Sequence, residues 1–384
     1  MSSPAIRFAG FTDDWEERKI QDLADRHDNL RIPITASNRV SGNTPYYGAN
    51  GIQDYVEGFT HDGEFILVAE DGANDLQDYP VNYVNFKVWV NNHAHVLQAK
   101  QFQADNKFLM NALKHTDIEP YLVGGGRAKL NAGTMMEISF PIPTVAEQSR
   151  IGKFFFALDD RITLHQRAHD KTVNIKKALL EKMFPKAGED KPEIRFAGFT
   201  DAWEQRKLGE ITSEFSGYAT LEAGLPLFTS ARSGLMYQCE YRGNQTTDSK
   251  KTLFSVVPLN ACTYRHMSDD DVFHMNINTL EKGLVSREYP VFLSTEGNDL
   301  NFIIQHLNSS SPFRAFCKEQ KKGGTRTRLY YEALCEFTMQ VPTPTEQKRI
   351  SRCLLTLDDL LTLHQRELTK LQNIKKALLE KMFV

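Results

Sequence analysis

NIKKALLEKMF, at residues 174–184, returns letter for letter at residues 373–383 and is the strongest indication of how this chain folds. The pentapeptide TLHQR likewise occurs at residues 163–167 and again at residues 362–366. Repeats at a fixed separation are the signature of repeated structural units. The chain is therefore expected to build one architecture twice.

A second repeat opens each half of the chain. IRFAGFTD at residues 6–13 returns at residues 194–201, and each copy leads to a tryptophan, Trp15 or Trp203. The opening copies are 188 residues apart and the closing copies 199 apart, so the second intervening segment is about 11 residues longer than the first. The two intervening segments are unlike each other. Constant frames around divergent inserts predict one scaffold that presents two recognition surfaces.

The closing repeats predict two long helices of some 40 residues each. Thr144 with Glu147, and Thr343 with Glu346, form the N-cap and third-position acid of a helix start. Apolar residues then recur at alternating steps of four and three, the heptad spacing of a coiled coil. Gly152 is the one glycine or proline within either helix after its start. We expect the two helices to pair, and to do so antiparallel.

Polar residues inside these helices are expected to be structural. The Leu-Asp-Asp steps at residues 158–160 and 357–359 could suggest paired metal ligands, but a solvated or partner-facing helix surface is the better interpretation. His165 and His364 fall on the apolar seam, where polar residues commonly set the register of a coiled coil.

Composition places the chain among globular proteins, with 41% hydrophobic and 25% charged residues. It shows neither an apolar run long enough to span a bilayer nor a secretory signal, so a cytoplasmic location is expected. The five cysteines form no C-x-x-C pair and are expected to be free thiols. With a formal net charge of −3, the chain could bind nucleic acid only through local basic residues or with charge from a partner.

The inserts predict a mixed fold with short strands and dense turns. Strands are expected at residues 65–69, 82–90, 253–257 and 290–294, and helices at 106–114 and 300–307. Turn signals occur at Gly42-Asn43, at residues 47–51 and at Asp71-Gly72.

A glycine-arginine pattern precedes both long helices at the same 199-residue spacing: GGGRAKL at residues 124–130 and GGTRTRL at residues 323–329. Glycines let the backbone approach a phosphate, and arginine offers a planar donor pair for phosphate or guanine. A tight turn with solvated arginines is the alternative, and two equivalent copies make the two interpretations about equal. The pattern makes candidates for DNA contact of Arg127, Lys129, Arg326 and Arg328.

Further basic and aromatic residues occupy glycine-rich loops of the inserts. Side chains of these types suit base edges and phosphates. For any single residue, an ordinary packed loop or solvated surface remains the commoner explanation. The candidates are Tyr46, Tyr47, Asn50, Arg232, Arg242 and Arg265.

The sequence lacks the familiar catalytic signatures. It has no G-x-x-x-x-G-K-[ST] phosphate loop, no H-E-x-x-H, no G-x-S-x-G and no Asn-Pro-Pro-Tyr methyltransferase motif. The acidic run at residues 269–271 falls in a predicted loop without partner ligands nearby in sequence. Neither a catalytic site, a metal site nor a cofactor is expected in this chain.

The whole pattern resembles the specificity (S) subunits of Type I DNA restriction-modification systems. Two variable α+β segments each precede a helical repeat, with GG-x-R-x-[KR]-L before each helix and P-x-P-x-x-x-E-Q at residues 141–148; the second copy, at residues 341–347, is one residue tighter. The resemblance covers essentially the whole chain. It maps the family's glycine-arginine loop onto Gly124, Gly125 and Arg127, and onto Gly323, Gly324, Thr325 and Arg326, with Gly126 and Ala128 departing from the second copy.

This resemblance implies a function. Each variable domain would be a target recognition domain that reads half of a split, asymmetric site in double-stranded DNA. The paired helices would space the domains and dock two modification subunits. Those subunits would bind S-adenosylmethionine and methylate adenine, and restriction subunits would join them for cleavage.

The resulting expectation is an α+β fold: two target recognition domains separated by an antiparallel pair of coiled-coil helices, with a pseudo-two-fold internal repeat. The predicted divisions are recognition domains at 1–143 and 194–342, helical spacers at 144–184 and 343–384, and a linker at 185–193. The predicted chain is a non-catalytic specificity subunit. Two alternatives stay open. The chain could be a nuclease or methyltransferase in its own right, which S-adenosylmethionine binding by the isolated chain would favour. It could also be a coiled-coil adaptor with protein-binding domains, which sequence-specific DNA binding would exclude.

Overall fold

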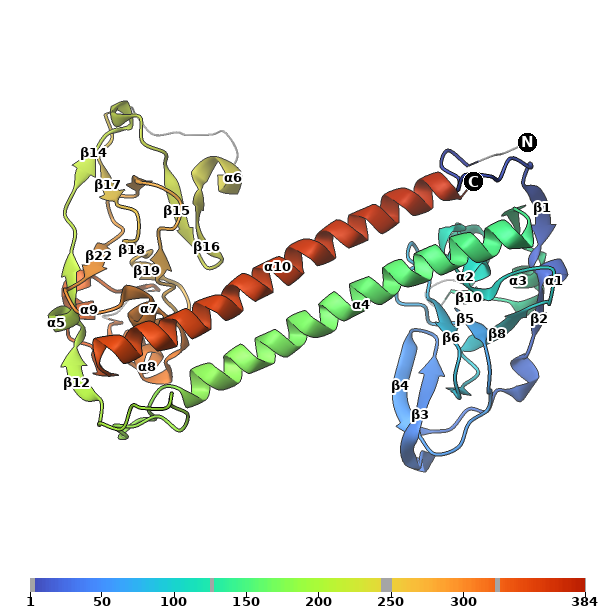
Figure 1. Cartoon of the computed structure of the whole chain (residues 1–384), viewed down its shortest axis with the longest axis horizontal. Coiled ribbons are helices and arrows are strands. Elements are labelled where there is room, and N and C mark those ends of the chain that lie inside the picture. Colours follow the sequence, from blue (N-terminus) through green and yellow to red (C-terminus); the bar gives the residue numbers. More distant parts are fainter. Residues whose placement is uncertain (1–3, 125–127, 243–250, 322–324, 384) are drawn as a thin grey trace. The chain divides into compact units, whose positions relative to one another are not determined.

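The computed structural model describes residues 4–383 apart from 125–127, 243–250 and 322–324. The chain divides into two compact units, and the first unit combines two stretches that are far apart in the sequence (Figure 1). The first unit contains residues 1–168 and 364–384, and the second contains residues 169–363. Each unit therefore includes the end of a long helix that belongs, by sequence, to the other half.

The main sheet of the first unit has four antiparallel strands in the order β2-β8-β5-β6. Its central strand β5 is buried along its whole length, which explains its uninterrupted apolar sequence Phe-Ile-Leu-Val-Ala. Helix α2 packs against this sheet. The bounds are β2 Ala24–Arg26, β8 Ala94–Ala99, β5 Phe65–Ala69, β6 Val81–Val84 and α2 Asn106–His115.

A second sheet of this unit corrects two expectations. Residues 82–90 do not form one strand: β6 pairs with β5, whereas β7 (Trp89–Val90) joins β3 (Ser41–Gly48) in a sheet of order β4-β3-β7. The Gly42-Asn43 signal is no turn either, because the register shift between Ser41 and Thr44 makes it a bulge within β3. The expected turn at residues 47–51 does join β3 to β4 (Gly51–Val56).

Short elements complete the first unit. The frame strand β1 pairs with β11, directly before the long helix. The strands on either side of the first glycine-arginine segment, β9 and β10, pair with each other. The bounds are β1 Glu16–Lys19, α1 Ile20–Leu23, β9 Leu122–Val123, β10 Lys129–Leu130, α3 Ala132–Glu137 and β11 Ser139–Ile142, with single 3-10 turns at Asp28–Leu30, Ala36–Asn38 and Glu119–Tyr121.

The second unit repeats the frame and the order of the four-stranded sheet, and varies the rest of the insert. Its sheets have the orders β13-β22-β18-β20 and β14-β17-β21, with two-stranded pairs β15-β16, β12-β24 and β19-β23. The strands are β12 Glu204–Lys207, β13 Thr212–Glu214, β14 Tyr218–Ala219, β15 Phe228–Ala231, β16 Gly234–Tyr237, β17 Phe254–Val257, β18 Cys262–Thr263, β19 Met267–Ser268, β20 Asn276–Ile277, β21 Gly283–Val285, β22 Val291–Ser294, β23 Thr327–Arg328 and β24 Thr338–Val341. The helices are α5 Leu208–Ile211, α6 Gln238–Arg242, α7 Leu300–Ser309, α8 Ser311–Glu319 and α9 Tyr331–Cys335, with a 3-10 turn at Leu221–Ala223.

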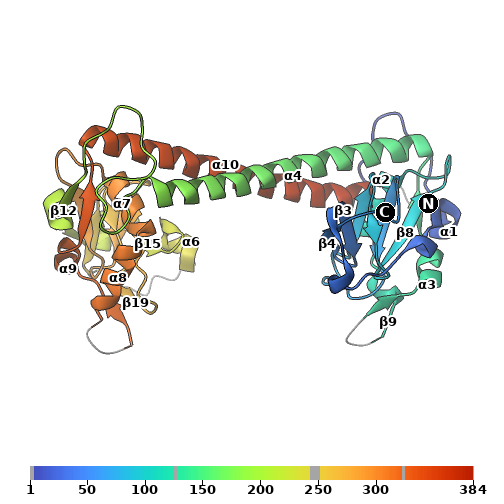
Figure 2. The same ribbon diagram turned by 90° about the horizontal axis from the view of Figure 1, so that it is seen from below.

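The two closing repeats form the long helices α4 (Val145–Lys182, 38 residues) and α10 (Pro344–Met382, 39 residues). Within the first unit, the start of α4 lies beside the end of α10 (Figures 1 and 2). Lys375 Nζ lies 2.5 Å from Asp159 Oδ1, and the Nδ1 atoms of His165 and His364 are 3.2 Å apart. The helices are thus antiparallel, as expected, and the histidines meet on the seam.

The second unit makes the same helix contact with the equivalent residues. Lys176 Nζ lies 2.5 Å from Asp358 Oδ1, a pair displaced from Lys375 and Asp159 by the 199-residue repeat. Asp159 and Asp358 therefore face the partner helix, and the Leu-Asp-Asp steps hold the helix pair together. The division of the remaining chain into recognition domains and a linker stays a prediction.

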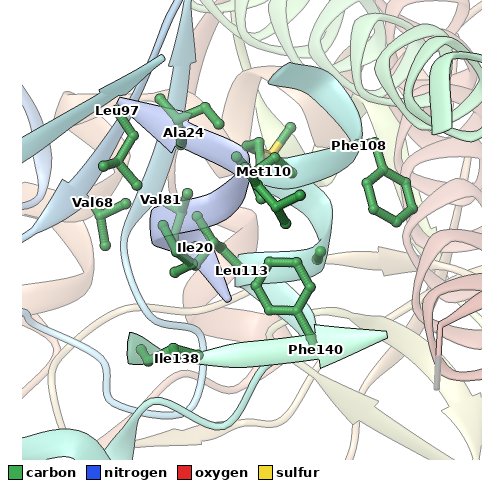
Figure 3. Packing of buried hydrophobic residues seen from close by; sticks show 14 of the residues in the cluster. Ile20, Ala24, Val68, Val81, Leu97, Phe108, Met110, Leu113, Ile138 and Phe140 are labelled. Atoms are coloured by element: carbon green, nitrogen blue, oxygen red, sulfur yellow. The ribbon is translucent and has the colours of Figure 1, made fainter. Parts of the chain in front are cut away.

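The tail of each helix completes the core of the unit built from the other repeat. In the first unit, Phe383 stacks on Phe108 of α2 (5.4 Å between centroids) and meets Trp15 edge-on (6.3 Å). Figure 3 shows Phe108 in this core with Ile20 and Phe140 from the frame. In the second unit, Phe184 packs on Phe302 of α7 (5.4 Å) and on Trp203 (6.2 Å). The identical tails therefore dock on equivalent residues.

Glu147 and Glu346 clamp the opening repeats to the helix starts. The fully buried Glu147 carboxylate accepts hydrogen bonds from Arg7 Nε (2.9 Å) and Nη2 (2.6 Å). Glu346, also fully buried, accepts from Arg195 Nε (2.7 Å) and Nη2 (2.8 Å). Two parallel bonds to one carboxylate are the strong form of this contact. The acids expected to take part in helix capping thus bind the opening repeats.

The neighbouring glutamine joins three segments. Gln148 Nε2 donates to the Pro143 carbonyl (2.9 Å), and its Oε1 accepts from the Asp105 backbone N–H (3.1 Å), directly before α2. Gln347 makes the equivalent bonds to the Pro342 carbonyl (2.9 Å) and from Asp299 (2.9 Å), directly before α7. The P-x-P-x-x-x-E-Q pattern is therefore a structural joint of the frame.

Gly152 allows α4 to approach α2 closely. A Cβ atom at this position would lie 2.7 Å from both Asp105 Oδ1 and the Phe108 nitrogen, so a larger residue would push the helices apart. Asp105 Oδ1 is the atom that caps α2, accepting from the Lys107 and Phe108 N–H groups.

Candidate nucleic-acid interface

The first glycine-arginine segment ends at Leu130, whose backbone N–H and carbonyl groups are both hydrogen-bonded to neighbouring segments. Leu130 is fully buried, and its backbone N–H donates to the Glu70 carbonyl at 2.7 Å. Its own carbonyl oxygen accepts from His95 Nε2 at 2.9 Å. Residue 130 is therefore a fixed end point for the segment that precedes it.

The second segment ends in the same way with different side chains. Leu329 is fully buried, its N–H donates to the His266 carbonyl at 2.8 Å, and its carbonyl accepts from Tyr264 Oη at 3.1 Å. The last leucine of the G-G-x-R-x-[KR]-L pattern is thus an anchor in both copies. Residues 125–127 and 322–324 lie outside the described chain, so the expected role of Arg127 has no structural account here.

Lys129, the second basic residue of the first segment, is held by a charged network beneath it. Its Nζ lies 2.9 Å from Glu70 Oε1, and Arg31 Nη1 lies 2.6 Å from Glu70 Oε2. Arg31 Nη2 and His95 Nδ1 also approach Asp28 Oδ2, at 3.5 Å and 2.7 Å. Lys129 keeps 45% of its side-chain surface exposed. It can therefore present charge to solvent while its position is constrained.

The half-buried carboxylates of Asp28 and Glu70 in this network remain ionised. Burial raises the pKa of Asp28, but hydrogen bonds from His95 and the Val96 N–H outweigh it and hold the pKa below its ordinary value. Burial likewise raises the pKa of Glu70, and the bonds from Arg31 and Lys129 bring it below normal. The network is thus a set of satisfied charges rather than a proton donor.

Asp28, Glu70 and His95 form the one cluster among the described residues whose ligand atoms are close enough for a metal ion. Their acceptors are already committed to cations. Arg31 and Lys129 bind Glu70, and both ring nitrogens of His95 face oxygen acceptors, so neither nitrogen is left to bind a metal. The chemistry of this cluster fits a structural role.

The three candidates in the β3–β4 hairpin are placed differently from one another. Tyr46 is 1% exposed: its hydroxyl bonds the Ile34 backbone and Arg39 lies over its ring at 4.1 Å. Tyr47 is also buried. DNA contact by either ring would require this segment to open. Asn50 is exposed at the hairpin turn, and its side chain bonds the Gly72 carbonyl at 2.9 Å. Its contact with DNA stays a prediction.

The second unit gathers three of the predicted arginines around one acidic loop. Arg326 Nε lies 2.7 Å from Asp269 Oδ1, and Arg232 Nη2 lies 2.5 Å from Asp270 Oδ2. Arg232, Arg265 and Asp269 line a hollow of about 590 Å³. Residues from β15, β19 and the following loop thus converge with the glycine-arginine segment on one surface.

The remaining candidates lie near this surface or outside it. Arg328 is exposed in β23, whose neighbour Thr327 pairs with Ser268 of β19. Arg242 ends α6, and its side chain lies outside the described part of the structure, although the preceding Tyr241 lines the hollow. Contact of Arg328 and Arg242 with DNA stays a prediction.

The acidic residues of this surface were not expected from the sequence. Residues 269–271 are predicted above to lie in a loop without partner metal ligands nearby in sequence. In the structure, Asp269 and Asp270 bind arginines and Asp271 accepts from the Thr327 hydroxyl. Their partners lie 38 to 57 residues away, which sequence spacing does not reveal. An acidic run inside an insert rich in arginine and tyrosine was the available signal.

Among the described residues, no helix is both long and apolar enough to cross a membrane. The five cysteines are free thiols, of which Cys262 and Cys317 are buried. Burial raises the pKa of the Cys317 thiol to about 12, which suppresses its reactivity.

Comparisons with known proteins agree on one family. Residues 12–174 match the family described as Type I restriction modification DNA specificity domain. A protein of Haemophilus influenzae whose name describes a type I restriction enzyme specificity subunit is 45% identical over 143 residues. That match covers 37% of this chain and 37% of the relative, so it spans little more than a third of the relative's length.

Solved structures share the fold. The S subunit of a Type I restriction-modification system from M. genitalium superposes with a TM-score of 0.71 at 14% identity, covering 100% of this chain and 99% of that one. The HsdS subunit from Thermoanaerobacter tengcongensis covers 96% of each chain at 15% identity, with a TM-score of 0.42. The first of these likenesses confirms the α+β fold with its long helices, and the family match over residues 12–174 agrees with the resemblance stated from the sequence.

Proposed function

We propose that this chain, a member of the Type I restriction-modification specificity family through residues 12–174, supplies the DNA sequence specificity of a methyltransferase and endonuclease complex. The observation that carries the proposal is one frame built twice around unlike surfaces. The Phe383 and Phe184 contacts, and the Glu147 and Glu346 clamps, are the same in both units. The inserts share the strand order of their four-stranded sheets, but they differ in their three-stranded sheets, β4-β3-β7 and β14-β17-β21, in their two-stranded pairs and in length.

Each unit then reads its own half of a bipartite site in double-stranded DNA. The leucine anchors support this, since Leu130 and Leu329 are held by the same backbone geometry but by different side chains, His95 and Tyr264. Because the two leucines are held alike but are surrounded by different side chains, the two units can prefer different bases while contacting DNA from equivalent positions. Exposed cations suited to phosphates or base edges are Lys129, Arg232, Arg265, Arg326 and Arg328, with Arg127 and Arg242 proposed from the sequence alone.

The helix pair provides docking surfaces for two modification subunits. Leu164 and Leu363 are equivalent in the repeat and stay 62% and 53% exposed, and Ile175 and Ile374 stay 41% and 39% exposed. Helix pairing alone does not require apolar residues at exposed positions. Identical exposed residues in two copies suit two copies of one partner. Those partners carry S-adenosylmethionine and methylate adenine, and restriction subunits complete the complex.

Methylation mapping of the host genome tests the function. A strain with this chain should carry adenine methylation at a motif of two short defined sequences separated by a fixed gap, and deletion of the chain should abolish that methylation. Catalysis belongs to the partners, so the chain purified alone should neither methylate nor cleave DNA. Loss of no motif on deletion, or loss of a single uninterrupted motif, would contradict the proposal.

A further inference from the structure

We infer that Asp269 and Asp270 compete with DNA for two arginines of the second unit. Asp269 pairs with Arg326 and Asp270 pairs with Arg232, and DNA has to break each ion pair before it can bind that arginine. The inference rests on the proposed function, because it concerns the same surface. It adds two acidic residues that lie outside the glycine-arginine pattern and that the sequence placed in a loop.

Both arginines and both acids are largely exposed to solvent. In the ion pair Arg326–Asp269 the side chains are 52% and 64% exposed, and in Arg232–Asp270 they are 69% and 44% exposed. Each pair is made by a single nitrogen and a single oxygen at 2.7 Å and 2.5 Å. An arginine held in this way keeps further donors and can rotate towards a phosphate or a guanine edge.

The acidic loop itself is rigid. Asp270 Oδ1 accepts from Ser268 Oγ at 2.8 Å, and Ser268 Oγ in turn accepts from the Val272 N–H at 3.1 Å. Asp271 adopts a φ of 61° and accepts from the Thr327 hydroxyl. The hydrogen bonds from Ser268 and Arg232 hold the pKa of Asp270 below its ordinary value, so this acid is ionised at neutral pH. Asp270 therefore keeps its position when Arg232 leaves, and Asp269 is attached to the same hydrogen-bonded loop.

The hollow beside the pairs has the features of an unfilled contact surface. Arg232, Arg265 and Asp269 line it, together with His266. His266 is only 2% exposed, and its Nδ1 atom has no hydrogen-bond partner among the described residues. Buried polar atoms are nearly always satisfied in folded proteins, so this Nδ1 atom is open to a hydrogen bond with water or with a bound group at the hollow.

The restraint has a measurable size. An exposed ion pair changes an equilibrium by roughly two- to fivefold, and this is the factor by which each aspartate should weaken DNA binding. Non-specific binding rests on phosphate contacts, so the restraint acts on every duplex. Its consequence is a second unit that does not stay on arbitrary DNA, in a chain whose net charge is −3.

The experiment uses the full chain together with its methyltransferase subunits. Binding is measured at several salt concentrations to two duplexes, one with the mapped motif and one with its second half scrambled. Asp269→Asn with Asp270→Asn should tighten binding to both duplexes by roughly four- to twenty-five-fold, the product of two exposed pairs. The slope of log affinity against log salt should steepen by about one for each freed arginine.

Two controls make the result specific. Glu336→Gln removes a charge from another exposed pair of this unit, Lys207–Glu336 at 2.6 Å, which does not line the hollow. It should change affinity less than twofold. In an Arg326→Ala background, Asp269→Asn should give no gain, because the arginine that it releases is gone.

Three results would overturn the restraint: an equal gain from Glu336→Gln, a gain that persists without Arg326, or weaker binding of the motif duplex, which would make the aspartates base contacts. Failure of the proposed function looks different. In that case the unaltered complex would not distinguish the two duplexes at all.

Discussion

Phe383→Ala is expected to destabilise the first unit by about 3–5 kcal/mol, the usual cost of removing a buried aromatic ring. Phe383 is 6% exposed and touches Trp15, Phe108 and Phe155, all of which belong to the first half of the sequence. The measurement is hydrogen exchange resolved by segment. Amides of α2 should lose protection, while those of α7 in the second unit should keep it.

Phe184→Ala is the matched experiment. Its ring packs on Trp203, Phe302 and His306, so protection should be lost in α7 and retained in α2. Phe102→Ala is the control for the substitution itself, since Phe102 is 80% exposed and its loss should leave stability unchanged. If Phe383→Ala instead weakened residues 194–342, each helix tail would serve its own half of the chain and the exchange of tails would be wrong.

Glu147→Ala is expected to destabilise the first unit by about 3 kcal/mol or more, measured by chemical denaturation. The substitution leaves Arg7, whose side chain is only 12% exposed, without its bidentate partner. Removing one member of a buried ion pair strands the charge of the other. Replacing both Arg7 and Glu147 by leucine should recover much of the loss, because no unpaired charge then remains.

Glu137→Ala provides the contrast on the surface. Glu137 pairs with Lys19 at 2.5 Å, but the side chains are 55% and 48% exposed, so the loss should stay within about 1 kcal/mol. Equal effects of Glu147→Ala and Glu137→Ala would show that the buried clamp adds nothing beyond an ordinary surface pair. The opening repeats would then be conserved between the two halves for another reason.

The parts of the fold that sequence patterns predicted are those governed by local periodicity. The long helices follow from heptad spacing, and β5 follows from its continuous apolar run at residues 65–69. Residues 82–90 were wrongly predicted as one strand. Their apolar spacing is suitable throughout, but β6 and β7 pair with different partners, and strand pairing is a property of the tertiary structure.

Contacts between residues far apart in the sequence could not be predicted from local periodicity. The helix tails look like ordinary amphipathic ends, and only the fold shows that Phe383 belongs with Trp15. Tyr46 and Tyr47 had the composition of a binding loop but are buried in the folded unit, and their contact with DNA stays a prediction. The partners of Asp269 and Asp270 are brought together by β19, β23 and β15, which meet only in the folded unit.

The central claim, that each unit reads one half of a bipartite site, is tested most directly by exchanging one insert and mapping the methylated motif. Residues 21–140 are replaced by the corresponding insert of a relative with the same frame, which leaves α4 and α10 unaltered. The account predicts that one half of the motif changes, while the other half and the gap set by the helices stay the same. A change in both halves, or in neither, would contradict it.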